Sequence, residues 1–262
     1  MDLGLRGKSA FVAASSQGLG LACARSLARE GAEVTLNGRE QARLAAAAAD
    51  LVTQVPGATI RWIAADLTTS AGRLKITTSL PQVDVLVTNN AGPPPGGLED
   101  WDEQALVGAL RANTVPAVEL MRAYLPGMRS RRFGRIVNIT SAMVKSPAYE
   151  MGLSASARAA LTAISKAIGK EVAADNVTVN NLLPERIDTP RQEFMARRLM
   201  TAHGIDRDEA RRRIASTIAA RRLGRPEEFG DACAFLCSVQ AGYICGQNLQ
   251  LDGGSYPGLT RR

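Results

Sequence analysis

Residues 9–20 read SAFVAASSQGLG, and this stretch decides the fold. Its first half, residues 9–14, is a short apolar run that predicts a buried β-strand. Its second half is a turn that opens a helix, and Gly18 and Gly20 there allow the backbone to approach a pyrophosphate closely. A tight strand-to-helix turn with no ligand is the alternative, because such a turn is a weak signal when it is taken alone.

The rest of the chain favours the nucleotide interpretation, because strand and helix patterns alternate to its end. Further strands are expected at 33–37, 59–64, 83–88, 135–140, 176–183 and 248–251. Helices are expected at 18–30, 40–52, 71–80 and 102–128, from the 149–161 stretch to about 174, across 190–218, and from 226. This alternation predicts an α/β fold with a doubly wound parallel sheet of about seven strands flanked by helices. We expect a single domain, residues 1–262, with a nucleotide at the first strand-to-helix turn.

Composition excludes several classes of protein. Apolar residues make up 45% of the 262 residues, close to the globular norm, so a disordered chain is not expected. No apolar run reaches the ~18 residues of a membrane span. The segment MDLGLRGKSAFVAA lacks the apolar region and cleavage site of a signal peptide, so we expect a cytoplasmic protein without a membrane partner.

Charge and ligand-type residues narrow the function further. The net charge of +7 comes mostly from arginine, which suits either nucleic acid or an acidic substrate. Aromatic residues are only 4% and no nucleic-acid motif occurs, so we favour solvated helix faces and some attraction for acidic substrates. The four cysteines lack metal-ligand spacing and His203 is the single histidine, so neither a metal site nor a Ser-His-Asp triad is expected.

The end of the second expected strand bears on the choice of cofactor. This strand ends at Asn37 without the carboxylate that would grip a ribose 2′-hydroxyl. Arg39 follows two residues later, and its guanidinium can pair with a 2′-phosphate as a rigid fork. The sequence therefore favours NADP(H) over NAD(H), with an ordinary exposed arginine as the alternative.

Several motifs, in this order and spacing, resemble the short-chain dehydrogenase/reductase superfamily, in particular its 3-oxoacyl-acyl-carrier-protein reductase-like members. They are SSQGLG at 15–20, ADLT at 65–68, NNAG at 89–92, RIVNITS at 135–141, NVTVNNLLP at 176–184, IDT at 187–189, RLGRPEE at 222–228 and GQNLQLDGG at 246–254. The resemblance covers nearly the whole chain. It implies a Rossmann-like fold, an NAD(P)-dependent oxidoreductase, and a homodimer or homotetramer packed through helices 102–128 and 153–174.

The resemblance also assigns roles to single residues. Together with the first turn and Arg39, it predicts a cofactor site made of Ser15, Gln17, Gly18, Leu19, Gly20, Arg39, Asp66, Leu67, Asn90, Ala91, Gly92, Ile187 and Thr189. Positions 66–67 are expected near the adenine, 90–92 beside the ribose, and Ile187 and Thr189 at the nicotinamide amide. The residues at the family's catalytic positions are Asn113, Ser141, Ser154 and Arg158.

The chain departs from the family pattern at three places. Alanines occupy 13–14, where the family has Thr-Gly, and Ala14 fits there only if its φ is negative. Glu185 replaces the glycine of a Pro-Gly pair, which puts a carboxylate near the expected edge of the cofactor. The family's Tyr-x-x-x-Lys is replaced by Ser154 and Arg158, so this chain resembles a subgroup with an imperfect catalytic tetrad.

The missing phenol leaves three interpretations of the site. In the first, Arg158 and Ser141 donate hydrogen bonds to the developing oxyanion, and a water held by Ser154 delivers the proton. In the second, Tyr149 swings in and supplies the phenol. In the third, the chain binds NADP(H) with little reductase activity and acts as a sensor or an oligomer partner. We favour an oxidoreductase that reduces a carbonyl substrate, because so many cofactor motifs persist beside Ser141.

Two further segments bear on the site. Asn113 matches the family's helix asparagine, and Pro116 leaves the carbonyl of Ala112 without a helical donor, so a kink there would free backbone oxygens for a water. Segment 190–218 lies at the family's mobile substrate lid and mixes apolar residues with many arginines. Such a lid suits a small-molecule or acyl-thioester carbonyl substrate, for example on acyl carrier protein or coenzyme A. An amphipathic helix that packs on its own domain is the alternative.

Overall fold

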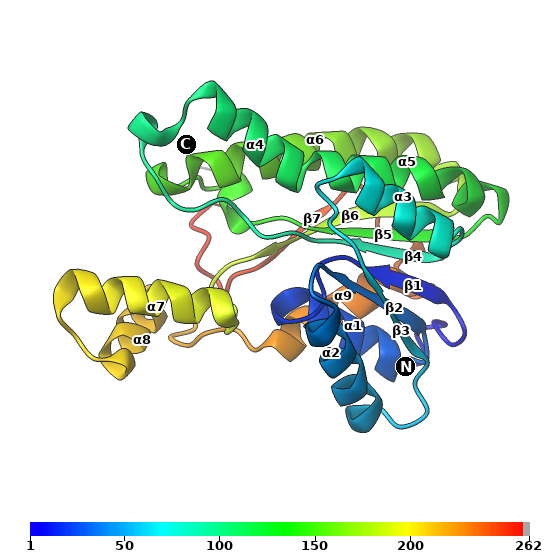
Figure 1. Ribbon diagram of the computed structural model, residues 1–262, viewed down its shortest axis with the longest axis horizontal. Helices are drawn as coiled ribbons and strands as arrows, with labels where there is room; N and C mark the ends of the chain where they lie inside the picture. The colour runs from blue at the N-terminus through cyan, green and yellow to red at the C-terminus, as the bar shows by residue number, and fades with distance from the viewer. Residues whose placement is uncertain (259–262) are drawn as a thin grey trace.

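The computed structural model describes residues 1–258 and contains a parallel sheet with helices on both faces (Figure 1). Its strands are β1 (Ser9–Val12), β2 (Glu33–Gly38), β3 (Ile60–Ala64), β4 (Val85–Thr88), β5 (Gly134–Ile139), β6 (Val177–Pro184) and β7 (Asn248–Leu251). Their order is β3-β2-β1-β4-β5-β6-β7, and every pairing is parallel. The predicted doubly wound sheet of about seven strands is therefore confirmed.

Two apolar layers hold the helices against this sheet. The helices are α1 (Gly18–Arg29), α2 (Gln41–Gln54), α3 (Ser70–Ser79), α4 (Glu103–Asn113), α5 (Val115–Ser130), α6 (Gly152–Val172), α7 (Pro190–His203), α8 (Arg207–Ser216) and α9 (Pro226–Cys237). One core packs α1, α2 and α9 on one face, and a second core packs α3, α5 and α6 on the other (Figure 1). No helix within residues 1–258 is long and apolar enough to cross a membrane.

The order of the strands fixes where a ligand can sit. The chain runs outward from β1 to β3, then returns to place β4 on the opposite side of β1. Ligands of open α/β sheets bind beside the carboxyl ends of the strands at such a reversal, because the two flanking loops diverge there. The turn at Ala14–Gly20 and the loop after Thr88 are these two loops, so the fold brings two of the predicted motifs together.

Helices α7 and α8 form an arm that projects beside the carboxyl edge of the sheet (Figure 1, yellow). The arm has a small core of its own, built on Ala196, Ala210 and Ile214. Three apolar residues of the expected lid, Met195, Leu199 and Met200, pack against that core. These three residues therefore fit the alternative, an amphipathic helix that packs on its own domain, better than an acyl-binding face. Phe194 keeps 45% of its surface exposed.

The expected helix 102–128 is two helices that break at Thr114, which corrects the prediction of one continuous helix. The missing N–H of Pro116 leaves the carbonyl of Ala112 free, as the sequence indicated. A side chain occupies that carbonyl, because Asn90 Nδ2 donates to it at 2.6 Å. The oxygen expected to hold a water therefore anchors the NNAG loop instead.

Candidate active site

The turn between β1 and α1 has the tight geometry of a phosphate-binding loop. Gly18 has a φ of +61°, and a methyl group on Gly20 would lie 2.5 Å from the carbonyl oxygen of Ala14. Gln17 precedes α1 without a side-chain capping bond, and the first turn of that helix carries no acidic residue. The free N–H groups of this helix start are therefore available to a pyrophosphate.

Ala14 does not meet the condition set from the sequence, since its φ is +45° rather than negative. This left-handed conformation costs an alanine roughly 1–2 kcal/mol. Hydrogen bonds from both sides hold it in place. Its N–H donates to Asn37 Oδ1 at 3.3 Å, and its carbonyl accepts from Asn89 Nδ2 at 3.2 Å. The loop therefore keeps the shape that the family glycine would give it.

Two polar residues support this loop from inside the protein. Ser15 is fully buried, and its hydroxyl donates to the Val12 carbonyl at 2.7 Å and accepts from the Asn37 N–H at 3.0 Å. Asn37 is also buried, and its Nδ2 donates to the carbonyls of Ile63 and Ala65. Ser15 was expected to contact the cofactor, but its side chain has no exposed surface and instead fixes the loop.

The end of β2 presents an exposed cation. Arg39 is exposed, and no carboxylate within residues 1–258 pairs with it. Asp66 lies nearby, because Arg39 helps to lower its pKa, although the N–H and hydroxyl of Thr68 contribute more. Ser16, which the sequence analysis overlooked, faces Gly38, with its Oγ 3.5 Å from where a methyl group there would lie. Its position in the glycine-containing turn was the sequence signal that could have identified Ser16 as a candidate for the cofactor site.

The NNAG loop lies against Arg158 at the carboxyl end of β4. A methyl group on Gly92 would lie 3.0 Å from Nη1 and 3.2 Å from Nη2 of Arg158, so the guanidinium rests on the backbone of the loop. Asn90 orders the same loop, since its Oδ1 accepts from the Ala91 N–H at 2.9 Å. The structure thus brings predicted ribose-side residues and a predicted catalytic residue into contact.

Arg158 and Ser154 act as one unit on α6. They are four residues apart on one helix face, and Arg158 Nη1 donates to Ser154 Oγ. Arg158 makes no salt bridge within residues 1–258, and its buried Nε has no hydrogen-bond partner there. Burial, followed by the positive charge of Arg191, lowers the pKa of Arg158 to about 10. The side chain is therefore still charged at neutral pH but lacks the partners that usually satisfy a buried arginine.

A small cavity opens in front of this guanidinium. It is lined by Ala13, Leu67, Thr88, Asn89, Asn90, Ala112, Asn113, Pro116, Ala117, Leu120, Ile139, Arg158 and Leu161. Arg158 is its only charged lining residue, and no carboxylate of residues 1–258 is among them. The cavity joins the cofactor side, through Leu67 and Asn90, to the catalytic side, through Asn113 and Arg158.

The other predicted catalytic residues keep polar atoms available. Ser141 caps the turn after β5, because its Oγ accepts from the Met143 N–H at 3.2 Å, which leaves its O–H free to donate. Asn113 is buried at the end of α4 with its Nδ2 on the Ala109 carbonyl at 3.3 Å. Asn113 also lines the cavity, and the catalytic roles of both residues stay predictions.

Tyr149 is held away from the cavity. It is 63% exposed, its hydroxyl accepts from the Leu98 N–H at 2.9 Å, and its ring lies 5.6 Å from that of Trp101. Swinging this phenol into the site would require both contacts to break. The structure therefore gives no support to Tyr149 as the proton donor.

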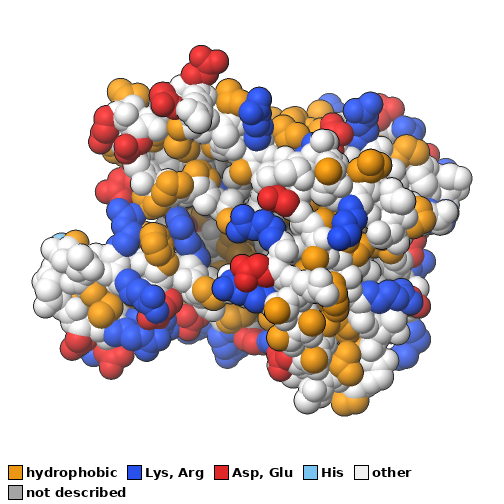
Figure 2. Space-filling view, viewed as in Figure 1, with side chains coloured by type: hydrophobic (Ala, Val, Ile, Leu, Met, Phe, Trp, Pro, Cys, Tyr) orange, Lys and Arg blue, Asp and Glu red, His pale blue; other side chains and the backbone are white. Residues whose placement is uncertain are grey.

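The segment after β6 covers the cofactor side. Thr189 lies across from the glycine-containing turn, with its Cβ 3.9 Å from where a methyl group on Gly18 would be. Ile187 is buried and bridges to Gly224. Glu185 pairs with Arg186 at 3.0 Å and lines a second cleft with Asp252, so its carboxylate is not aimed at Arg158's cavity. Figure 2 shows the face between the α7–α8 arm and the sheet as a hollow with Lys and Arg side chains around it.

Comparison with known proteins decides the family. A family model described as enoyl-(acyl carrier protein) reductase matches residues 13–256, which is nearly the whole chain. The chain belongs to the short-chain dehydrogenase/reductase superfamily. The resemblance stated from the motifs is therefore confirmed, while the alignment of Ser154 and Arg158 with the tyrosine and the lysine of the family stays a prediction.

Relatives from this superfamily match the chain over nearly its full length. The NADPH-dependent reductase BacG of Bacillus subtilis is 32% identical over 95% of this chain and 97% of its own. The 3-oxoacyl-[acyl-carrier-protein] reductase FabG of Vibrio harveyi is 31% identical, over 97% and 99% of the two chains. The structure of L-sorbose reductase from Gluconobacter frateurii, complexed with NADPH and L-sorbose, is 31% identical with a TM-score of 0.92, covering 99% and 100%.

Proposed function

We propose that this protein is an NADPH-dependent reductase that delivers hydride to a carbonyl carbon, with Arg158 in place of the family phenol at the carbonyl oxygen. One observation carries the proposal: Arg158 is pinned by Ser154, rests on Gly92, and keeps unpaired N–H donors in an otherwise uncharged cavity. A reductase needs such a donor where negative charge develops.

The residues present fit NADPH. The turn at Gly18 and Gly20 and the uncapped start of α1 suit its pyrophosphate, and the unpaired Arg39 suits its 2′-phosphate. Gly92 lies against Arg158 and Asn90 lines the same cavity, which supports a ribose site for the nicotinamide end of the cofactor there. When bound, NADPH supplies the hydride.

Arg158 and Ser141 stabilise the charge that forms on the carbonyl oxygen. Each has a donor that is not used inside the protein, namely the free guanidinium N–H groups and the serine O–H. Losing one such donor costs enzymes about 10²–10³-fold in kcat. Because Arg158 stays protonated at neutral pH, it acts through its charge and its hydrogen bonds.

The proton comes from water in this scheme. Ser154 Oγ accepts from Arg158, so its own O–H is free to donate toward the substrate side. A water bridged by this hydroxyl is within the reach that general acid catalysis requires, about 2.6–3.2 Å per hydrogen bond. Arg158 makes this water more acidic by its positive charge.

The experiment is a spectrophotometric assay of NADPH oxidation against a panel of ketones, oxo acids and acyl thioesters, beside thermal unfolding with NADPH or NADH. We expect NADPH to raise the Tm more than NADH and at least one carbonyl class to be reduced. The other interpretation, a cofactor-binding protein with little activity, predicts the same Tm shift with no turnover on any class. Absence of any Tm shift at millimolar cofactor would contradict both.

We also propose a homodimer or homotetramer packed through the helices α4, α5 and α6. Several large apolar side chains on α4 and at the start of α5 are exposed: Leu106, Val107, Leu110 and Val115. Contiguous exposed apolar side chains are typical of an interface. Analytical ultracentrifugation tests this, and a monomer at micromolar concentration would contradict it.

A further inference from the structure

The arginines of the α7–α8 arm fall into two sets. Five of them lie within 4.0 Å of a carboxylate of Asp188, Glu193 or Glu209: Arg197, Arg207, Arg211, Arg212 and Arg213. Arg191 and Arg198 have no such partner within residues 1–258. Most arginines of the arm are therefore paired. The two unpaired ones are seven residues apart on α7, so they lie on the same side of that helix.

Arg191 lies on the segment that covers the cofactor side. It is in the first turn of α7, two residues after Thr189, whose side chain lies across from Gly18. Its guanidinium lies 5.3 Å from the centre of the Phe194 ring, and it is close enough to Arg158 for the two positive charges to oppose each other. The amino end of α7 adds partial positive charge at the same place.

This arrangement lacks a negative charge. Two guanidinium groups act on each other, Arg158 Nε has no acceptor, and no carboxylate of the described residues lines the cavity. A buried, unpaired cation is costly, and such clusters recur where a protein binds an anion. The anion must then come from a ligand.

We propose that Arg158 and Arg191 bind a carboxylate of the substrate itself, so that the enzyme reduces a free oxo acid. The inference rests on the proposed function, since it names the class of carbonyl that the same site would take. A carboxylate one or two carbons from the carbonyl presents oxygens of both groups on one edge. The planar fork of Arg158 can donate to both, and Arg191 supplies a second cation from the lid.

The position of Arg158 favours a free acid over a thioester. Arg158 lies at the reacting oxygen in the proposed chemistry, so an anion that satisfies it has to be close to the carbonyl. In an acyl thioester of coenzyme A or acyl carrier protein, the nearest anion is a phosphate many bonds away. A neutral ketone brings no anion and leaves both arginines unpaired.

Acetoacetate, methyl acetoacetate and acetoacetyl-coenzyme A make a matched set of probes, and 2-oxobutyrate with its methyl ester makes a second. The esters are intrinsically the more reactive carbonyl compounds, so a preference for the acid has to come from the protein. We expect the wild type to have at least about tenfold higher kcat/KM for an acid than for its ester, which corresponds to about 1.4 kcal/mol.

Arg191→Gln tests the lid cation, and Arg197→Gln is the matched control. Both arginines are exposed on α7, but Arg197 belongs to the paired set and lies 3.9 Å from Glu193. We expect Arg191→Gln to lower kcat/KM for the acid about tenfold more than for the ester, mainly through KM. Arg197→Gln should leave the acid-to-ester ratio within about twofold. Oxamate is a carboxylate that accepts no hydride. Calorimetry should show that it binds more weakly to Arg191→Gln with NADPH than to the wild type with NADPH.

The remaining outcomes separate this inference from the proposed function. If esters or the thioester are reduced as well as the acids, the carbonyl reductase stands and the carboxylate site is wrong. If Arg191→Gln raises KM for NADPH more than KM for the acid, Arg191 serves the phosphates of the cofactor and the inference is overturned. If NADPH binds but no probe of either set is reduced and oxamate does not bind, both proposals fail.

Discussion

Two arginines at opposite edges of the sheet, one buried and one partly buried, differ in how the protein satisfies their hydrogen-bond donors. Arg135, at the amino end of β5, is 1% exposed and donates to the carbonyls of Ser238, Gly134 and Asn176, each at 2.9 Å. Arg158, at the carboxyl edge, has Ser154 as its side-chain partner and an unpaired Nε. Neither pairs with a carboxylate within residues 1–258, but only Arg135 has its donors satisfied by the protein.

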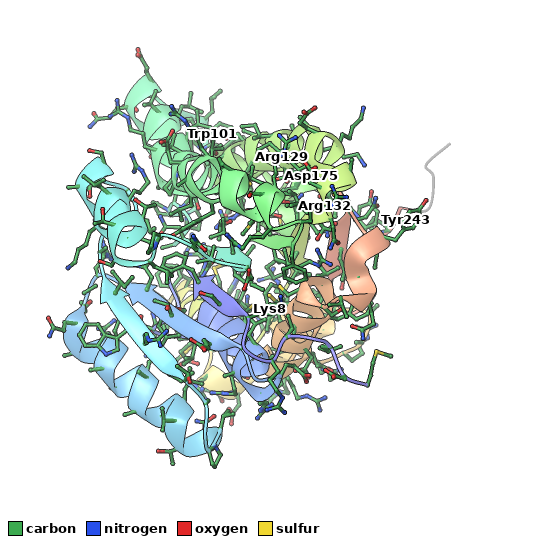
Figure 3. The ribbon with its side chains drawn as sticks, turned by 90° about the vertical axis from the view of Figure 1, so that its right-hand side faces the viewer. Lys8, Trp101, Arg129, Arg132, Asp175 and Tyr243 are labelled. Carbon is green, nitrogen blue, oxygen red and sulfur yellow. The ribbon has the colours of Figure 1, made fainter. Side chains whose placement is uncertain are left out.

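The surroundings repeat this contrast. Arg129 and Arg132 point toward Asp175 at the amino edge, with distances of 2.6 and 3.8 Å (Figure 3). At the carboxyl edge, the positive charge of Arg191 adds to burial in lowering the pKa of Arg158, and neither arginine pairs with a carboxylate within residues 1–258. The comparison teaches that burial and charge alone do not mark a functional arginine. Unused donors beside a cavity do, and the predictions below test this distinction.

The largest effect is expected from Arg158→Met. Arg158 has few contacts in the protein, so its loss should leave the Tm the same or slightly higher. The same change removes a donor at the carbonyl oxygen, which should lower kcat/KM about 100-fold or more. Steady-state NADPH oxidation and thermal unfolding measure the two quantities. A marked fall in the Tm of Arg158→Met would show that Arg158 is structural and would remove the contrast with Arg135.

Arg135→Met is the matched variant at the other edge and should show the reverse. It removes three hydrogen bonds from a buried guanidinium to backbone carbonyls, of which that of Asn176 also accepts from the Gly134 N–H, and this costs roughly 3 kcal/mol or more of the free energy of unfolding. For a chain of this length the Tm should fall by about 6–12 °C. The KM for the substrate of the folded fraction should change little. A Tm within about 2 °C of the wild type would contradict the prediction.

Ser154→Tyr combined with Arg158→Lys restores the family pattern and should move the site toward neutral ketones. The phenol can hand over its proton directly, so turnover of a simple ketone should rise about tenfold or more. The acid-to-ester preference should shrink, since the guanidinium fork is gone. NADPH binding by thermal shift is the control. Intact binding with no gain on ketones would count against the alignment of positions 154 and 158.

Arg39→Ser should lower the preference for NADPH over NADH by about tenfold, because one charge-assisted contact with the 2′-phosphate is lost. The ratio of the KM values for NADPH and NADH measures it. Arg43→Ser, on an exposed arginine that pairs with Glu40 at 3.1 Å, is the matched control. An equal ratio in all three proteins would mean that Arg39 faces only solvent.

The smallest effect is expected for a partly exposed glutamate that pairs with two arginines. Arg222 and the N–H of Arg225 lower the pKa of Glu228 to about 2, from the 4.5 of a free glutamate. The depressed pKa means that the carboxylate stabilises the fold above about pH 4.5 and that this contribution is lost as the pH falls toward 2. Glu228→Gln should therefore lower the Tm slightly at pH 7, with the difference from the wild type vanishing near pH 2.

Much of the fold followed from local patterns. The alternation of strand and helix, and the glycines at 18 and 20, are local signals, so they predicted the parallel sheet and the phosphate-binding turn. Contacts between distant segments could not be predicted in this way. Ser15 was expected to contact the cofactor and Asn37 to end the second strand, yet both are buried and bonded to each other. Arg191 was one of many arginines in the sequence, and only the fold shows that its charge lowers the pKa of Arg158, after the larger effect of burial.

Pro116 on α5 influences how the NNAG loop is held in place. The loop asparagine, Asn90, is held by the carbonyl oxygen of Ala112, which is free because the proline four residues later has no N–H. Pro116→Ala would return that hydrogen and set up a competition for one acceptor. A change on the helix that lines the far side of the cavity would then loosen the nucleotide pocket, and the two positions would have to be altered together.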